Sequence, residues 1–194
     1  MVQAGLGQNP DAVAIVGDSV VCQATLQGLV TAGNDKPVIG ITPCLDPEVV
    51  NAIGADGLNG MILFSGADPF SDDPEAKLYR DVMAKYAPDT DASIFAANGF
   101  QSMLGFVRAF QAGLAGDTVT PETVAAAMKA AKNVPLPVGH GETFSCDSSA
   151  MGPGLIASTI CSSILFVQVV EGTELTSDFK PLDSSVIYKS TFGG

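Results

Sequence analysis

Two short apolar runs near the N-terminus flank a segment with helical character. The runs are AVAIVG at residues 12–17 and PVIGI at residues 37–41, and neither alternates with polar residues. Such Val- and Ile-rich runs are typical of strands buried on both faces of a parallel sheet. The segment from Ser19 to Ala32 ends at Gly33-Asn34, a typical helix C-cap. We therefore predict a strand–helix–strand unit with a right-handed crossover.

The carboxyl ends of these two strands are the first place to expect function, because ligands of open parallel sheets bind beyond such ends. The residues there are Gly17-Asp18-Ser19 after the first strand and Ile41-Thr42-Pro43 after the second.

Three later segments share one type of helix start, in which a capping side chain, a proline and an acid follow one another. The capping oxygen satisfies free amides, proline fits the first helical position, and the acid suits the positive end of the helix. The predicted helices end near Ile53, Tyr86 and Ala131, and their starts are Asp46-Pro47-Glu48, Asp73-Pro74-Glu75 and Thr120-Pro121-Glu122. A fourth, mostly apolar helix is predicted from Asp91 to Ala112, and its broad apolar surface suggests packing on more than one side.

Strand patterns occur between and after these helices. Residues 57–65, GLNGMILFS, predict a strand that leads into a loop rich in Asp, Pro and Gly. Residues 134–139 are extended by their prolines, and strand-like patterns follow at residues 142–146, 163–172 and 184–190. Strands in succession without long helices usually pair antiparallel at a sheet edge. The fold class is therefore α/β, with an open parallel sheet flanked by helices and late antiparallel strands.

Composition excludes several kinds of partner. The chain has 194 residues, 46% of them hydrophobic, which is enough for a core, and its net charge is −12. This acidity argues against nucleic acid and against an anionic membrane surface, both of which require basic patches. The longest apolar stretch, residues 155–170, is interrupted by Ser, Thr and Gln and is shorter than a membrane span.

The N-terminal residues MVQAGLG lack the basic region and long apolar core of a secretory signal. They resemble the end of an amphipathic helix that leads into a strand. We therefore expect this chain to be part of a longer protein.

The four cysteines favour two disulfides. Cys22 lies in the first turn of the first helix and Cys44 just after the second strand, so both lie at the same edge of the sheet. Cys146 and Cys161 flank a loop that contains Gly152-Pro153-Gly154, which suits a local bridge. Four cysteines allow three pairings, of which we prefer 22–44 with 146–161, and four free thiols in a cytosolic protein are the alternative. Disulfides would indicate an oxidising compartment.

Catalytic and metal-binding patterns are scarce. The sequence has no Gly-x-Ser-x-Gly elbow, P-loop or His-Glu-x-x-His. His140 could act as a general base, although a lone histidine in a Gly/Pro loop is more often a surface residue. Asp68, Asp72 and Asp73 could bind calcium, but their spacing differs from that of an EF-hand and helix capping explains Asp73. We therefore expect no enzyme activity, no metal and no cofactor.

Three stretches, PDAVAIVGDSVVCQATLQGLVTAGNDKPVIG, GADGLNGMILFSGADPFSDDPEAKLYRDVMAKYAP and ANGFQSMLGFVRAFQAGL, together resemble the second half of a type I periplasmic solute-binding protein. They are most similar to the branched-chain amino acid and amide-binding branch that serves ABC transporters. The resemblance rests on the order of the predicted strands and helices and on their residue patterns between Val2 and Ala131. It is weaker beyond Ala131.

The resemblance implies a receptor with two lobes that enclose a small polar solute, and a membrane permease as its partner. The ligand-binding residues that it implies are Asp18, Ser19, Thr42, Pro43, Asp46, Asn98 and Phe100. Amino-acid-binding members commonly carry an acid in the second loop, whereas this chain has Thr42 there and Asp46 as the nearest acid. This departure disfavours an α-amino acid as the ligand.

The resemblance also implies how the chain is divided. Residues 1–66 would form part of the second lobe, residues 67–133 a hinge crossing with helices that return toward the first lobe, and residues 134–194 the hinge return and last strands. Most of the first lobe is missing, so the apolar helix would lack its usual cover, and we expect a swapped or tightly associated homo-oligomer.

The implied location is the periplasm or the outer face of the cell membrane, with a lipid anchor on the full-length protein as one form of attachment. Two other functions remain open at this point. One is a ligand-sensing domain of the same fold in a receptor or regulator, and the other is a small α/β enzyme that uses His140 with Asp or Cys groups.

Overall fold

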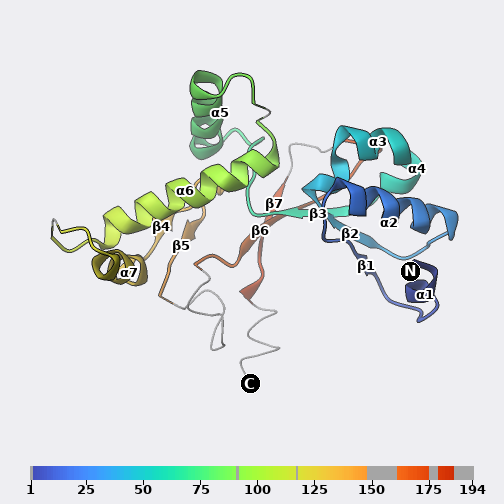
Figure 1. The fold of residues 1–194 in the computed structure, drawn as a ribbon, viewed down its shortest axis with the longest axis horizontal. Helices are drawn as coiled ribbons and strands as arrows, with labels where there is room; N and C mark the ends of the chain where they lie inside the picture. Colours follow the sequence, from blue (N-terminus) through green and yellow to red (C-terminus); the bar gives the residue numbers. More distant parts are fainter. Residues whose placement is uncertain (1, 91, 117, 148–160, 175–178, 186–194) are drawn as a thin grey trace. The chain divides into compact units, whose positions relative to one another are not determined.

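The chain folds into two compact units, which we describe separately (Figure 1). The computed structural model describes residues 2–90, 92–116, 118–147, 161–174 and 179–185. The first unit comprises Met1–Ser65 and Phe166–Lys180, and the second comprises Gly66–Leu165 and Pro181–Gly194. The three-part division expected from the sequence, with its hinge crossing, stays a prediction.

A five-stranded sheet runs in the order β1-β2-β3-β6-β7 in the described residues. β1 pairs with β2 and β2 with β3 in parallel, whereas β6 pairs with β3 in antiparallel fashion. The strands are β1 (Val13–Ala14), β2 (Val38–Ile41), β3 (Ile62–Ser65), β6 (Ile164–Val169) and β7 (Lys180–Asp183). Both the parallel sheet and the late antiparallel strand were predicted from the sequence, and the structure confirms them.

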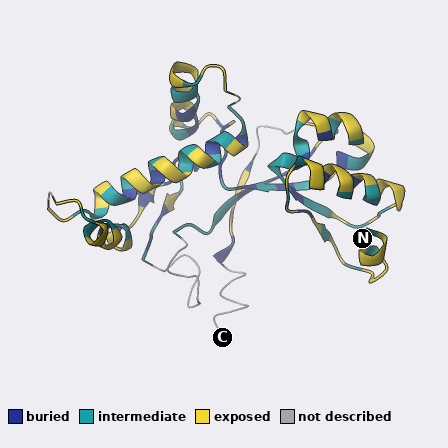
Figure 2. Cartoon of the chain, viewed as in Figure 1, coloured by how far each residue is buried: buried dark blue, intermediate teal, exposed yellow. Residues whose placement is uncertain are grey.

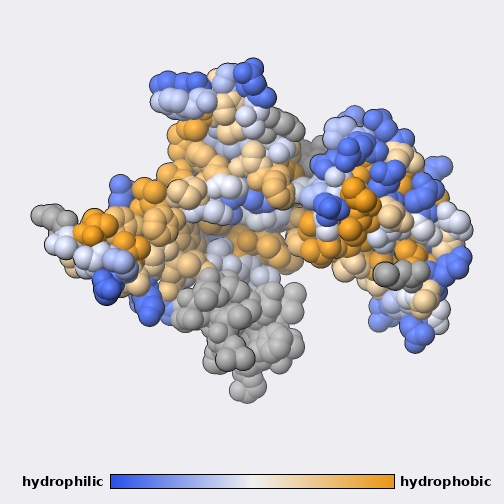
Figure 3. Space-filling model, viewed as in Figure 1, coloured by the Kyte–Doolittle hydropathy of each residue, from blue (hydrophilic) through white to orange (hydrophobic). Residues whose placement is uncertain are grey.

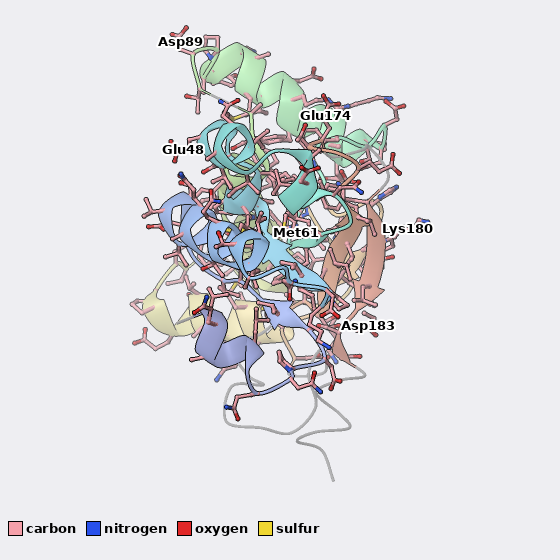
Figure 4. All side chains as sticks on the ribbon, turned by 90° about the vertical axis from the view of Figure 1, so that its right-hand side faces the viewer. Glu48, Met61, Asp89, Glu174, Lys180 and Asp183 are labelled. Atoms are coloured by element: carbon pink, nitrogen blue, oxygen red, sulfur yellow. A yellow bond between two sulfur atoms is a disulfide. The ribbon has the colours of Figure 1, made fainter. Side chains whose placement is uncertain are left out.

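The first unit places its helices around the parallel strands. They are α1 (Val2–Leu6), α2 (Ser19–Thr31), the 3₁₀ turn η1 (Thr42–Leu45), α3 (Pro47–Ile53) and α4 (Ala55–Leu58). α2 follows the predicted bounds, because Asp18 caps its start and Gly33, with φ of 63°, follows its end. Its buried face consists of Cys22, Leu26 and Leu29. Figure 4 shows Met61 among the elements of this unit, where it is buried and its sulfur lies beside Gly40.

Two predictions for the first unit were wrong. Residues 57–61 do not extend the strand, because a short helix, α4, occupies Ala55–Leu58 between Gly54 and Gly60, both of which have positive φ. The first strand is not buried on both faces either. Val13 is half-buried and Ala14 is exposed, because β1 is an edge strand of the sheet (Figure 2).

The second unit contains three longer helices and a small hairpin. They are α5 (Pro74–Tyr86), α6 (Ile94–Gly113) and α7 (Pro121–Ala130), with β4 (Val134–Pro135) paired antiparallel to β5 (Thr143–Phe144). Asp73 and Thr120 cap α5 and α7 as predicted. One core cluster consists of Ala109, Ala131, Val134, Leu136, Phe144 and Cys146, and a second contains Ala67, Ala76, Tyr79, Ala97 and Val138.

The long helix of this unit differs from the prediction in two ways. It begins at Ile94, after the cap Ser93, rather than at Asp91, which lies outside the described residues. Among the described residues, its buried side chains also lie on one side of the helix. Ala97, Gly105 and Ala109 are buried, whereas Phe95, Met103 and Phe106 are exposed.

The last part of the chain yields one new strand. β7 (Lys180–Asp183) was not predicted, since its proline and charged residues are unusual in a strand interior. The strand expected at residues 184–190 lies almost wholly outside the described residues. Within the part of the chain that the structure describes, no helix has the length and apolar character needed to cross a membrane.

Candidate functional site

A disulfide holds together the two loops at the carboxyl edge of β1 and β2. Cys22 in the first turn of α2 is bonded to Cys44 in η1, with 5.0 Å between their Cα atoms. Both side chains are fully buried. The second bridge joins Cys146 and Cys161, so both predicted pairings are confirmed. The first bridge brings the loop after β1 next to the loop after β2.

Asp18 and Ser19 form the first of these loops. The Asp18 carboxylate accepts a hydrogen bond from the Val21 amide at 2.9 Å and so caps α2. Asp18 is nevertheless exposed, and Ser19 behind it is half-buried. Both side chains are therefore at least partly accessible to solvent. The Asp18 carboxylate caps α2 and remains accessible.

Thr42, Pro43 and Asp46 belong to the second loop, and all three are half-buried. Thr42 and Pro43 begin η1, and Asp46 stands between the end of η1 and the start of α3. The prediction that the Asp46 side chain caps α3 was wrong, since it makes no capping hydrogen bond there. Instead the Asp46 carbonyl oxygen accepts from the amides of Val49 and Val50. The carboxylate is therefore not used to cap this helix.

The remaining two candidates, Asn98 and Phe100, lie on α6 in the second unit. Phe100 is half-buried and stacks obliquely on Tyr79, with 5.3 Å between the ring centroids. The Asn98 side-chain oxygen lies close to Gly66, whose carbonyl accepts from Gln101 Nε2 at 2.7 Å. Phe100 thus has a packing role, and the ligand-binding role of both residues stays a prediction.

Sequence reasoning missed a contact between Asp68 and His140 in the second unit. His140 Nδ1 lies 3.3 Å from Asp68 Oδ2, and the Asp68 side chain is fully buried. The other carboxylate oxygen accepts from the Phe70 amide at 3.1 Å, and the Asp68 amide donates to the Val138 carbonyl at 3.0 Å. No local pattern could reveal this pair, because a loop after β3 and a turn after β4 supply its two members.

Burial raises the pKa of the Asp68 carboxyl above its ordinary value, because the ionised form loses water. The Phe70 amide and His140 oppose this shift, and the nearby Asp73 adds to it. Asp73 itself caps α5 and accepts a hydrogen bond from the Ser71 hydroxyl, so two of the three acids considered for calcium, Asp68 and Asp73, have separate structural contacts. Among the described residues, no group of three His, Cys, Asp or Glu side chains could bind a metal.

The substitution Asp68→Asn tests this electrostatic description. An acid whose pKa is raised by folding stabilises the folded state while protonated, and that contribution is lost as the pH rises through the raised pKa. Asparagine keeps the acceptor for Phe70 and cannot ionise. The stability of the variant relative to the parent protein is therefore expected to increase as the pH rises above about 4, the ordinary pKa of an aspartic acid. Urea unfolding at a series of pH values measures it, and a constant difference across that range would contradict the assignment.

Two grooves in the described part of the first unit contain no predicted ligand residue. One of about 940 Å³ lies between α1, β1 and α2, with a mainly apolar lining that includes Leu6, Val13 and Gly28. The other, of about 630 Å³, lies at the amino ends of β2 and β3. The predicted ligand residues of this unit are exposed or half-buried and line neither groove.

The comparisons with known proteins agree on one family. The family described as periplasmic binding protein matches residues 1–160. No curated protein sequence matches the chain closely enough to count as a relative.

Solved structures give the same result for the fold. A branched-chain amino acid ABC transporter protein from Thermus thermophilus with bound valine has a TM-score of 0.67 and 18% identity, covering 100% of this chain and 51% of its own. A leucine-binding protein from Thermotoga maritima has a TM-score of 0.63 and 16% identity, with coverages of 94% and 47%. A solute-binding protein from R. palustris in complex with benzoate has a TM-score of 0.56 and 16% identity, with coverages of 94% and 45%. The chain thus spans about half the length of these structures.

Proposed function

Because the chain belongs to the periplasmic binding protein family, we propose that it forms part of an extracytoplasmic receptor that binds a small polar solute for import. The family and the similar structures are binding proteins rather than enzymes. The observation that carries the proposal is the disulfide between Cys22 and Cys44, which fixes two polar loops side by side at the carboxyl edge of the sheet.

The chemistry of these loops favours a solute with an amino or amide group. The hydroxyls of Ser19 and Thr42 can donate or accept hydrogen bonds, and the Asp46 carboxylate can accept from an ammonium or amide. Asp46 suits this role better than Asp18, since the Asp18 carboxylate already caps α2 whereas Asp46 caps no helix. The similar structures with bound valine or benzoate support a solute of this size. Asn98 and Phe100 also belong to the proposed set of ligand-binding residues.

The proposed partner is the membrane permease of an ABC importer, reached from the periplasmic or extracellular side. The family is extracytoplasmic, and two disulfides fit an oxidising compartment. A lipid anchor on the full-length protein and self-association of the chain belong to this proposal as well.

A comparison of Asp46 with Asp18 tests the proposal. A thermal-shift panel of amino acids, amides and ureas first identifies a ligand, because a solute that binds the folded form raises its melting temperature. Asp46→Asn is then expected to weaken binding of that ligand by at least about tenfold, since hydrogen bonds to charged groups contribute ~1.5–3 kcal/mol. The same variant is expected to melt close to the parent protein, because the Asp46 side chain caps no helix.

Asp18→Ala is the matched comparison. Loss of the cap on α2 is expected to lower stability by about 1 kcal/mol, whatever the ligand. Calorimetric titration and melting curves separate the two effects. A panel without any stabilising solute, or an Asp46→Asn variant that binds as tightly as the parent protein, would refute the proposed site.

A further inference from the structure

The turn between β4 and β5, residues 137–141, has an unfavourable backbone conformation. Val138 and His140 have φ of 51° and 54°, which lie in the left-handed region. A β-branched residue such as valine rarely adopts this conformation, because its side chain crowds the backbone there. The Val138 side chain is nevertheless fully buried, in the core cluster with Tyr79 and Ala97. Contacts from outside the turn must therefore hold it in place.

Two residues, Gln101 and Asp68, supply such contacts. Gln101 Nε2 donates to the Pro137 carbonyl at 2.9 Å, and the Asp68 amide donates to the Val138 carbonyl at 3.0 Å. The Asp68 carboxylate also reaches the turn, with Oδ2 3.3 Å from His140 Nδ1. We call Asp68, Gln101 and the turn the clamp. Two hydrogen bonds and one charge pair thus fix the turn to the segment after β3 and to α6.

The charge pair makes the clamp sensitive to protonation. The Asp68 side chain is fully buried, whereas 39% of the His140 side chain is exposed. Oδ2 of Asp68 accepts no hydrogen bond from the described residues, so an ionised carboxylate depends there on the positive charge of His140. Burial raises the pKa of the Asp68 carboxyl, while the Phe70 amide and the His140 charge oppose this rise. Deprotonation of His140 therefore leaves a buried negative charge without its cationic partner.

Other charges near the clamp do not replace that of His140. They come from the loop after β3, α5, α6 and the hairpin, and are Asp72, Asp73, Glu75, Arg80, Arg108 and Glu142. The two arginines are bound elsewhere, one to carbonyls of the loop and the other to Glu75. α6 carries only one of these charges, and Figure 3 shows apolar residues along much of this helix. Asp73 acts on Asp68 with a like charge.

We propose that the clamp is a pH-sensitive switch, closed while His140 is protonated and released as the pH rises. In the closed state, Val138 stays in its core cluster and its carbonyl stays bonded to the Asp68 amide. In the released state, residues 137–141 relax toward ordinary backbone conformations and the Asp68 carboxylate gains water. The proposal concerns the second unit alone and holds whether or not the chain binds a solute.

The two titrations act in the same direction. An acid whose pKa is raised in the closed state favours that state while protonated, and this preference is lost as the pH rises through the raised pKa. A histidine charge that faces a carboxylate also favours the closed state, and histidine ordinarily loses this charge between about pH 5 and 8. Release is therefore expected to begin above about pH 4, the ordinary pKa of an aspartic acid, and to continue to about pH 8.

Hydrogen exchange followed by NMR tests the proposal, because the exchange rate of a protected amide reports how often its segment opens. The reporter is the Asp68 amide, with its rate corrected for the intrinsic effect of pH. Its protection is expected to fall at least about tenfold between pH 4 and pH 8, the scale of one charge-assisted contact. The Cys146 amide donates to the Ala131 carbonyl in the same unit, and its protection should stay constant as the internal control.

Two substitutions identify the charges. Asp68→Asn cannot ionise, so its residue-68 amide should be equally protected at pH 4 and pH 8. His140→Asn removes the charge and places a residue that tolerates positive φ in the turn. Its loss of protection between pH 6 and pH 8 should be smaller than that of the parent chain, because it has no histidine charge to lose in this range.

A parent chain whose Asp68 amide keeps its protection from pH 4 to pH 8 would overturn the proposal. An equal loss at Cys146 would do the same, since the whole unit rather than the clamp would then be opening. The proposal also fails if Asp68→Asn loses protection like the parent chain, or if His140→Asn matches the parent between pH 6 and pH 8.

Discussion

Replacing Cys22 and Cys44 together by alanine is expected to lower the free energy of unfolding of the first unit by about 3 kcal/mol. The bridge spans 22 residues of sequence, and a cross-link over a loop of that length removes much conformational entropy from the unfolded chain. It also joins the first turn of α2 to η1, so its loss frees the loops that carry Ser19 and Thr42. Weaker solute binding should accompany the loss of stability.

The second disulfide provides a matched control. Cys146 and Cys161 are separated by 15 residues, so the entropic model predicts a loss of similar size when both are replaced. Their bridge lies in the second unit, whereas β1 and β2 belong to the first. Urea unfolding and solute titration of the two double variants test the difference. Equal loss of binding in both would show that the first bridge has no special role in holding the loops.

Gly113→Ala is expected to destabilise the second unit by about 3 kcal/mol, the upper end of the usual cost of overpacking. Gly113 is the last residue of α6, and a Cβ added there would overlap the carbonyl oxygen of Ala127 in α7. Because the obstacle is backbone, a side-chain rotation cannot relieve it. α6 and α7 would have to move apart, which disturbs the core around Ala109 and Ala131.

Gly99→Ala in the same helix is the control, measured at low concentration so that self-association does not contribute. A Cβ at Gly99 meets no atom, and alanine favours a helix over glycine by roughly 0.5–1 kcal/mol. The two substitutions therefore add the same methyl group and should change stability in opposite directions. Urea midpoints that change by equal amounts in the same direction in both variants would mean that the contact with α7 does not determine the effect of Gly113→Ala.

The sequence predicted the elements that local chemistry defines. α2 was predicted from its apolar pattern, with Asp18 before it and Gly33 after it, and α5 and α7 from a cap followed by proline. These signals act within a few residues, so tertiary contacts rarely override them. The pairing of Cys22 with Cys44 could also be predicted from the sequence, because the carboxyl ends of neighbouring parallel strands lie at one edge of a sheet.

The missed features depend on longer-range or competing interactions. α4 was taken for a strand because its residues continue into the apolar run of β3, and the positive φ of Gly54 and Gly60 was not evident from the sequence. Asp46 was expected to cap α3, but η1 immediately before it sets the backbone there and leaves the carboxylate away from the helix amides. The contact of Asp68 with His140 joins segments far apart in the chain. The candidate site itself was located by topology and resemblance rather than by any single motif.

The central claim is that the solute binds at the carboxyl edge of β1 and β2. The most direct measurement is an NMR titration of the isotope-labelled chain with the solute that the thermal-shift panel identifies, because such a titration follows each backbone amide and tolerates weak binding. We expect saturable shift changes at Asp18, Ser19, Thr42 and Asp46, with smaller changes elsewhere in the first unit. Changes confined to the groove between α1, β1 and α2, or no changes at these four amides at millimolar solute, would contradict the claim.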